Sequence, residues 1–98
     1  MPHILSYTTD PSLANGPDIP ENETVSAAAK AIFDAYFADG RITGITESEP
    51  DANTGTFDSE ITFVDEATCD AYLAEMEAID EFSKSGGARS NGARRNVD

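Results

Sequence analysis

The pattern of polar and apolar residues in this chain first indicates three strands. Residues 3–9 form a short β-prone run that ends at the chain-breaking pair Asp10 and Pro11. Residues 41–48 predict a second strand, with Gly44 as a candidate bulge. Residues 56–64 alternate apolar and polar side chains, which is typical of a strand with one buried and one solvated face.

Two further segments repeat apolar residues at spacings of three and four, which predicts amphipathic helices. The first covers residues 25–39, with Thr24 as its cap and Gly40 as its stop. The second covers residues 66–82 and follows Asp65, a good capping residue. The apolar faces of these elements predict one shared core. Its members are Ile32, Phe33, Tyr36, Phe37, Phe57, Ile61, Phe63, Leu73, Met76 and Ile79.

The order of these elements over residues 3–82 is β-α-β-β-α, which predicts a small α+β domain. The first strand, helix and second strand imply a right-handed parallel unit, and the second and third strands imply a hairpin. This order resembles the ferredoxin-like split βαβ arrangement, with its last strand missing or supplied weakly by residues 94–97. The resemblance implies two helices on one face of the sheet, and it carries no functional residue with it.

The charged residues divide the chain into two parts. Residues 1–83 hold eighteen acidic and two basic residues, whereas residues 84–98 hold four basic residues and one acidic residue. The first part is predicted to be a single acidic domain, and the second a flexible basic tail rich in glycine and arginine. Because the first part repels phosphates and anionic lipids, it is predicted to bind neither nucleic acid nor a membrane.

Composition adds a broad class and a compartment. A chain of 98 residues makes one domain at most, and a domain of this size is only marginally stable alone, which favours association. Its acid-rich, lysine-poor composition resembles that of proteins from halophilic or marine organisms. Neither a secretory signal nor a membrane-spanning run is evident, and a single cysteine allows no internal disulfide. The sequence therefore predicts a cytoplasmic protein, or part of an assembly formed in the cytoplasm.

The single histidine and the single cysteine are weak candidates for catalysis. His3 lies at the end of the chain, where fraying is expected and a general base lacks a pocket. Cys69 falls on the apolar face of the second predicted helix, which predicts a buried thiol and not a nucleophile. No phosphate-binding loop, zinc-protease motif or serine triad is present. The sequence therefore predicts no catalytic residue and no cofactor, and it does not favour an enzyme.

One turn approaches the ligand spacing of a calcium loop, which uses positions one, three, five and twelve. The residues concerned are Glu49, Asp51, Asn53 and Glu60. The glycine expected at the sixth position is one place late, at Gly55, and Glu60 falls inside a predicted strand, where it cannot close a loop. The prediction is therefore a polar hairpin turn, and no metal site.

The leading interpretation is a non-enzymatic interaction or assembly protein, such as a structural component of a larger particle, including a virion. In this interpretation the basic tail contacts an acidic partner protein or the acidic body of a neighbouring copy, because opposite charges attract. The predicted partner-binding residues are Lys84, Arg89, Arg94 and Arg95.

Two alternatives stay open. Small enzymes and ligand-binding proteins of the dimeric α+β-barrel type have a similar element order, but they need an apolar face on the sheet opposite the helices. Here Asp58 and Glu60 are predicted to point to that face. An acidic mimic of DNA, which would inhibit a basic DNA-binding protein, needs abundant carboxylates, and this chain has them.

Overall fold

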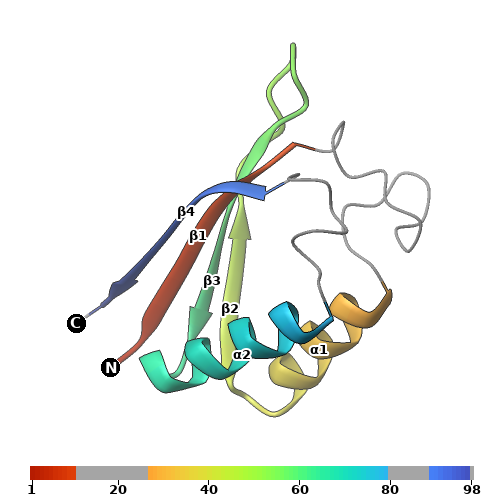
Figure 1. The fold of residues 1–98 in the computed structure, drawn as a ribbon. Coiled ribbons are helices and arrows are strands. Elements are labelled where there is room, and N and C mark those ends of the chain that lie inside the picture. Colours follow the sequence, from red (N-terminus) through yellow and green to blue (C-terminus); the bar gives the residue numbers. More distant parts are fainter. Residues whose placement is uncertain (11–26, 80–88, 98) are drawn as a thin grey trace.

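The structure is a computed structural model that describes residues 1–10, 27–79 and 89–97. Its elements are β1 (His3–Thr9), α1 (Ala27–Ala38), β2 (Ile42–Glu47), β3 (Phe57–Phe63), α2 (Glu66–Ala78) and β4 (Arg89–Asn96). The described strands form one antiparallel sheet in the order β2-β3-β1-β4, and both helices lie on the same face of it (Figure 1). The predicted α+β class and the helices on one face are confirmed, and the element order is compatible with the ferredoxin-like arrangement.

The basic end of the chain supplies the fourth strand. β4 pairs with β1 in antiparallel orientation, with His3 opposite Asn96 and Leu5 opposite Arg94. The two chain ends consequently lie side by side in Figure 1. Residues 89–96 therefore form the last strand of the sheet, a longer one than the weak strand expected over residues 94–97.

Several expected features agree with the structure, and others lie outside the described residues. The register of β2 against β3 shifts between Ile42 and Gly44, which confirms the bulge expected at this glycine. Asp65 caps α2, because its side chain accepts hydrogen bonds from the Thr68 N–H at 2.8 Å and from the Thr68 hydroxyl at 2.6 Å. These bonds lower the pKa of the Asp65 carboxyl. The expected cap at Thr24 and the residue Lys84 fall in the parts of the chain that the structure does not describe.

The core lies between the sheet and the two helices. Of its predicted members, four are buried and four are partly buried against it, namely Tyr36, Ile61, Phe63 and Met76, and Ile32, Phe33, Leu73 and Ile79. Phe57 is half-buried and is not part of this cluster. The buried apolar side chains are Leu5, Ala29, Tyr36, Ile42, Ile61, Phe63, Cys69, Tyr72 and Met76. Phe37 was expected among them, but it is 52% exposed. Adjacent helical residues point about 100° apart, so Tyr36 and Phe37 cannot both face the sheet, and Tyr36 takes the inner position. The prediction of Phe37 as a core residue is therefore wrong.

Tyr36 joins the two helices through its ring and its hydroxyl. The hydroxyl donates a hydrogen bond to Glu75 of α2, and the ring meets Tyr72 edge-on at a centroid distance of 5.3 Å. The Arg41 guanidinium lies over the same ring, 3.7 Å from its centroid. Burial, together with the hydrogen bond to the Glu75 carboxylate, raises the pKa of Tyr36 to about 12.

This raised pKa predicts a loss of stability at high pH. An unfolded tyrosine has a pKa of about 10, below the value of about 12 in the fold. The contribution of Tyr36 to the free energy of unfolding is therefore complete at pH values below the unfolded pKa. It disappears as the pH rises through the folded pKa. We expect it to be about 1–2 kcal/mol, since one pKa unit corresponds to about 1.4 kcal/mol and Glu75 is exposed. When urea unfolding is measured from pH 8 upward, the free energy of unfolding should fall less steeply with pH in Tyr36→Phe than in the native chain. Equal declines in the two proteins would contradict this role.

Candidate functional site

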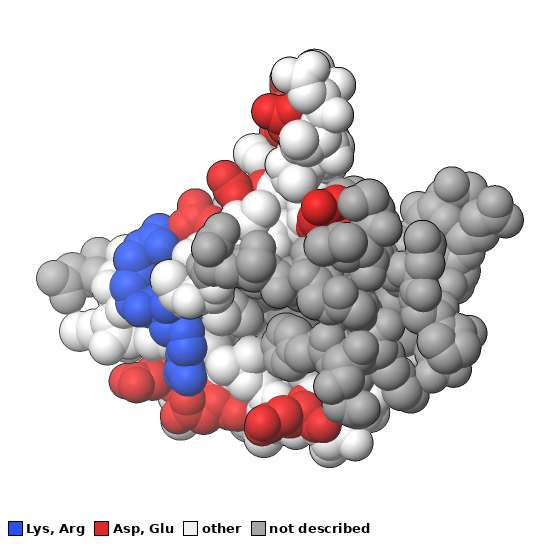
Figure 2. All heavy atoms as spheres, turned by 45° about the horizontal axis from the view of Figure 1, so that its top comes forward, with Lys and Arg blue, Asp and Glu red and all other residues white. Residues whose placement is uncertain are grey.

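The basic residues of the chain's end follow one edge of the sheet. β4 is the outermost strand beside β1, and residues 92–96 are exposed. Figure 2 shows a stripe of Lys and Arg atoms on the side of the molecule where β4 lies in Figure 1, with acidic atoms on both sides of it. A cationic strand therefore lies between groups of acidic side chains on this side of the molecule.

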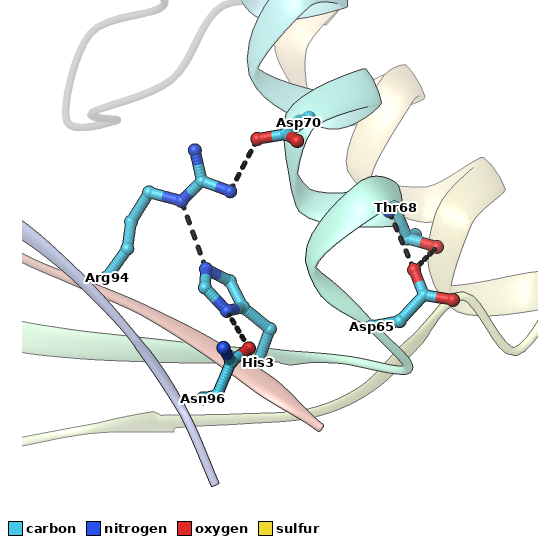
Figure 3. Close-up of polar contacts among 6 residues, drawn as sticks. All are labelled: His3, Asp65, Thr68, Asp70, Arg94 and Asn96. Carbon is cyan, nitrogen blue, oxygen red and sulfur yellow. Dashed lines mark hydrogen bonds and ion pairs between the residues drawn. The ribbon is translucent and has the colours of Figure 1, made fainter. Parts of the chain in front are cut away.

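On the helix-covered face, Arg94 is part of a chain of polar contacts (Figure 3). Its Nε donates to Nε2 of His3 at 3.0 Å, and its Nη2 donates to Asp70 of α2 at 2.6 Å. The other ring nitrogen of His3, Nδ1, lies 2.7 Å from the side-chain oxygen of Asn96. Because a guanidinium can only donate, Nε2 is an acceptor, and the imidazole holds its proton on Nδ1 and donates it to Asn96. His3 is only 3% exposed, so the fraying expected for it does not occur.

Cys69 lies close to this cluster, but it lacks the surroundings of a nucleophile. The residue is completely buried, and desolvation raises the pKa of its thiol, an effect that nearby Arg94 partly offsets. Cysteine, histidine and asparagine together are the residue types of some thiol enzymes. Here, however, the Arg94 guanidinium occupies Nε2 of His3, which is the nitrogen that could otherwise accept a proton. Among the described residues, this cluster fastens β1, β4 and α2 together and offers no activated nucleophile.

On the open face of the sheet, the side chains of β3 are polar, and Ile4 of β1 lies between Thr62 and Arg95. Arg95 donates to Glu60 of β3, and the Thr8 hydroxyl donates to Asp58 at 2.7 Å. An open depression along β1 and β3 is lined by Ser6, Tyr7, Thr8, Asp58, Ser59 and Glu60. Ligand pockets are usually concave and mostly apolar, so this surface does not resemble the pocket of a dimeric barrel.

The turn that resembled a calcium loop uses its central carboxylate internally. Asp51 Oδ1 accepts hydrogen bonds from the Asn53 N–H at 2.7 Å and from the Thr54 N–H at 3.0 Å, and these bonds lower the pKa of the Asp51 carboxyl. Glu60 lies on β3 and is paired with Arg95. In the described parts of the chain, no three His, Cys, Asp or Glu residues lie close enough together to hold a metal ion.

Of the four predicted partner-binding residues, the structure describes the side chains of Arg94 and Arg95. Lys84 lies outside the described residues, and Arg89 is placed by its backbone, opposite Thr9. Arg94 and Arg95 lie on opposite faces of β4, and each forms an ion pair with a carboxylate of the same chain. Sequence reasoning missed His3 and Asn96, whose only signal was a polar position at the end of a short strand.

No family model matches this chain. Searches of curated proteins and of solved structures found no match either. Neither described helix has the length and apolar character needed to cross a membrane.

Proposed function

We propose that this chain is a non-enzymatic interaction protein that binds an extended acidic segment of a partner protein along β4. The observation that supports it is the position of β4. This strand carries the arginines of the chain's end, and it is the outermost strand of the described sheet beyond β1. An edge strand presents backbone N–H and C=O groups to which a partner can add a further strand.

The pairing register of β4 with β1 indicates which backbone N–H and C=O groups of β4 are available to a partner strand. The Val97 N–H donates to the Pro2 carbonyl at 2.8 Å, so this pair is a hydrogen-bonded one. Bonded and non-bonded pairs alternate along an antiparallel ladder. Arg95 therefore turns its backbone groups toward β1, and the backbone groups of Arg94 and Asn96 point to the outer edge.

The side chains of β4 specify the chemistry of the partner. Arg94 and Arg95 lie on opposite faces of the sheet, and consecutive residues of an added strand also alternate between these faces. A partner segment with two consecutive carboxylates would thus offer one to each arginine. The ligand we propose is an extended peptide with such an acidic pair.

The ion pairs already made by these arginines leave room for this contact. In the Arg94–Asp70 pair the side chains are 31% and 60% exposed, and in the Arg95–Glu60 pair they are 53% and 42% exposed. Exposed pairs of this kind contribute only about 0–1 kcal/mol each. A guanidinium also has five N–H donors, so it can bind a second carboxylate without giving up the first.

The same contact, repeated between different molecules, would suit a structural component of a larger particle such as a virion. The DNA-mimic alternative is less well supported, because the arginines of β4 would repel a basic DNA-binding protein. The dimeric-barrel alternative is less well supported because the open face is polar around Asp58 and Glu60.

A labelled peptide tests this proposal. The probe is a threonine- and valine-rich peptide of about ten residues with a central Asp-Glu pair, and fluorescence anisotropy measures its binding to the full chain. We expect a dissociation constant of about 10–100 μM and binding about fivefold weaker for Arg95→Gln, equivalent to about 1 kcal/mol. Lys30→Gln on α1 is the matched control, because it makes the same charge change away from β4.

The peptide's own charge provides the second control. A peptide with Asn-Gln in place of Asp-Glu should bind markedly more weakly. Equal binding of the two peptides, or no binding of the acidic one at millimolar concentration, would show that the arginines of β4 serve the fold alone.

A further inference from the structure

In the part of the chain that the structure describes, the opposite edge of the sheet is β2, which carries fewer charges than β4. Past the bulge, residues 44–47 hold a single charge, on Glu47. Ile45 is 41% exposed there, and Phe37 of the neighbouring helix α1 is 52% exposed. Proteins normally protect an edge strand with lysines, prolines, inward-pointing charges or a covering element. An edge with exposed apolar side chains and so little charge is therefore one that a further strand can cover.

The backbone of β2 is arranged for such a strand. The Ser48 N–H donates to the Asp58 carbonyl at 2.8 Å, and the pairing continues with Thr46 opposite Glu60 and Gly44 opposite Thr62. By the alternation of an antiparallel ladder, these residues turn their backbone groups toward β3. Ile45 and Glu47 therefore turn theirs to the outer edge.

The charges at the two ends of β2 indicate what covers it. Arg41 precedes the strand, and Glu47 and Glu49 stand at its other end. When two β2 strands pair in antiparallel orientation, each Arg41 comes near the Glu47 and Glu49 end of the other copy. Arg41 is one of only two basic residues in the first 83. Its pair with Asp39 is exposed on both sides, at 41% and 60%, so the guanidinium can also bind a carboxylate of a neighbour.

Other pairings of edges are less favourable. Two β4 strands would place Arg94 and Arg95 of one copy against the same cations of the other. A β2 strand paired with β4 of another copy would be a head-to-tail contact, which extends without closing. Pairing of β2 with β2 is self-complementary and closes with two copies.

We propose that two copies of this chain associate through β2 in antiparallel orientation, which joins their sheets into one continuous sheet. Ile45 of each copy then lies beside the two-fold axis, where it is shielded from water. This interface is independent of the proposed function, because it uses the edge opposite β4 and leaves the arginines of β4 accessible.

Sedimentation equilibrium of the full chain tests this dimer directly. The expected mass is twice the chain mass of 10.4 kDa. Ile45→Lys puts a cation into the interface from each copy and should give a monomer. Ala71→Lys adds the same side chain at an exposed position of α2 and should remain dimeric. A native chain that stays monomeric up to about 1 mM, or equal masses for the two variants, would overturn the proposal.

Charge reversal keeps the test decisive if Ile45→Lys fails to fold. Glu47→Lys with Glu49→Lys places three cations at each β2 edge and should weaken the dimer at least about tenfold. Adding Arg41→Glu to this double variant restores opposite charges across the interface and should recover most of the lost affinity. A triple variant that stays as weak as the double variant would overturn the antiparallel orientation.

Discussion

Deletion of residues 89–98 is expected to unfold the domain. Without β4, the first strand becomes an edge, and the buried imidazole of His3 loses the partners of both ring nitrogens, Asn96 and Arg94. Each lost hydrogen bond contributes about 0.5–1.5 kcal/mol, and the backbone pairing of β1 with β4 is lost with them. Leu5, opposite Arg94, also loses its cover on one side. The total is comparable with the roughly 5 kcal/mol of stability that a small domain has.

Circular dichroism and urea unfolding of the truncated chain measure this effect. We expect the cooperative transition to disappear or to move to a much lower urea concentration. Arg95→Ala is the control, because it keeps the strand and removes only an exposed ion pair, and it should change the stability by less than about 1 kcal/mol. If the truncated chain unfolds at the native midpoint, β4 is dispensable and the tail acts as a flexible arm.

Phe63→Ala is expected to destabilise the domain by about 3–5 kcal/mol, enough to leave much of the protein unfolded. Phe63 is completely buried at the end of β3, between His3 of β1 and Ile42 of β2 in the sheet. Its ring packs against Tyr72 of α2 at a centroid distance of 5.2 Å. Truncation removes this contact and leaves a cavity where the sheet meets the helix.

Equilibrium unfolding in urea measures the loss of unfolding free energy in Phe63→Ala, and a variant of the next residue, Val64, serves as the control. Val64→Ala removes side-chain atoms from a position that is 39% exposed, so its cost should be well below that of Phe63→Ala. Similar losses in the two variants would mean that the buried face of β3 has been assigned incorrectly.

The contrast between β3 and β4 shows how much of this fold the sequence predicts. Residues 56–64 alternate in polarity, so the strand and its buried face follow from the local pattern, as does the start of α2 after Asp65. β4 has no such alternation, because it contains arginine, serine, asparagine and glycine with a single alanine. Its strand state depends on pairing with a segment eighty or more residues away, which local propensity does not capture.

The polar cluster was harder to predict for the same reason. A histidine at the third position suggests a frayed end, and only the approach of Arg94 and Asn96 makes it a buried hydrogen-bonding centre. Cys69 was predictable, because its place on the apolar face of a helix already implied burial. The charge of the tail was also predictable, but not that Asp70 and Glu60 of the same chain bind its arginines.

The pairing of β1 with β4 also bears on how the protein is made. β1 is an inner strand of the sheet, yet β4, one of its two neighbours, is synthesised after all the other described elements. While the chain emerges from the ribosome, this edge of β1 has no partner, and the sheet cannot be completed until residues 89–96 are released. Contacts between distant parts of a chain slow folding, and an unpaired strand edge promotes aggregation in the meantime. The strong negative charge of the first 83 residues would keep nascent and newly released chains apart during that interval.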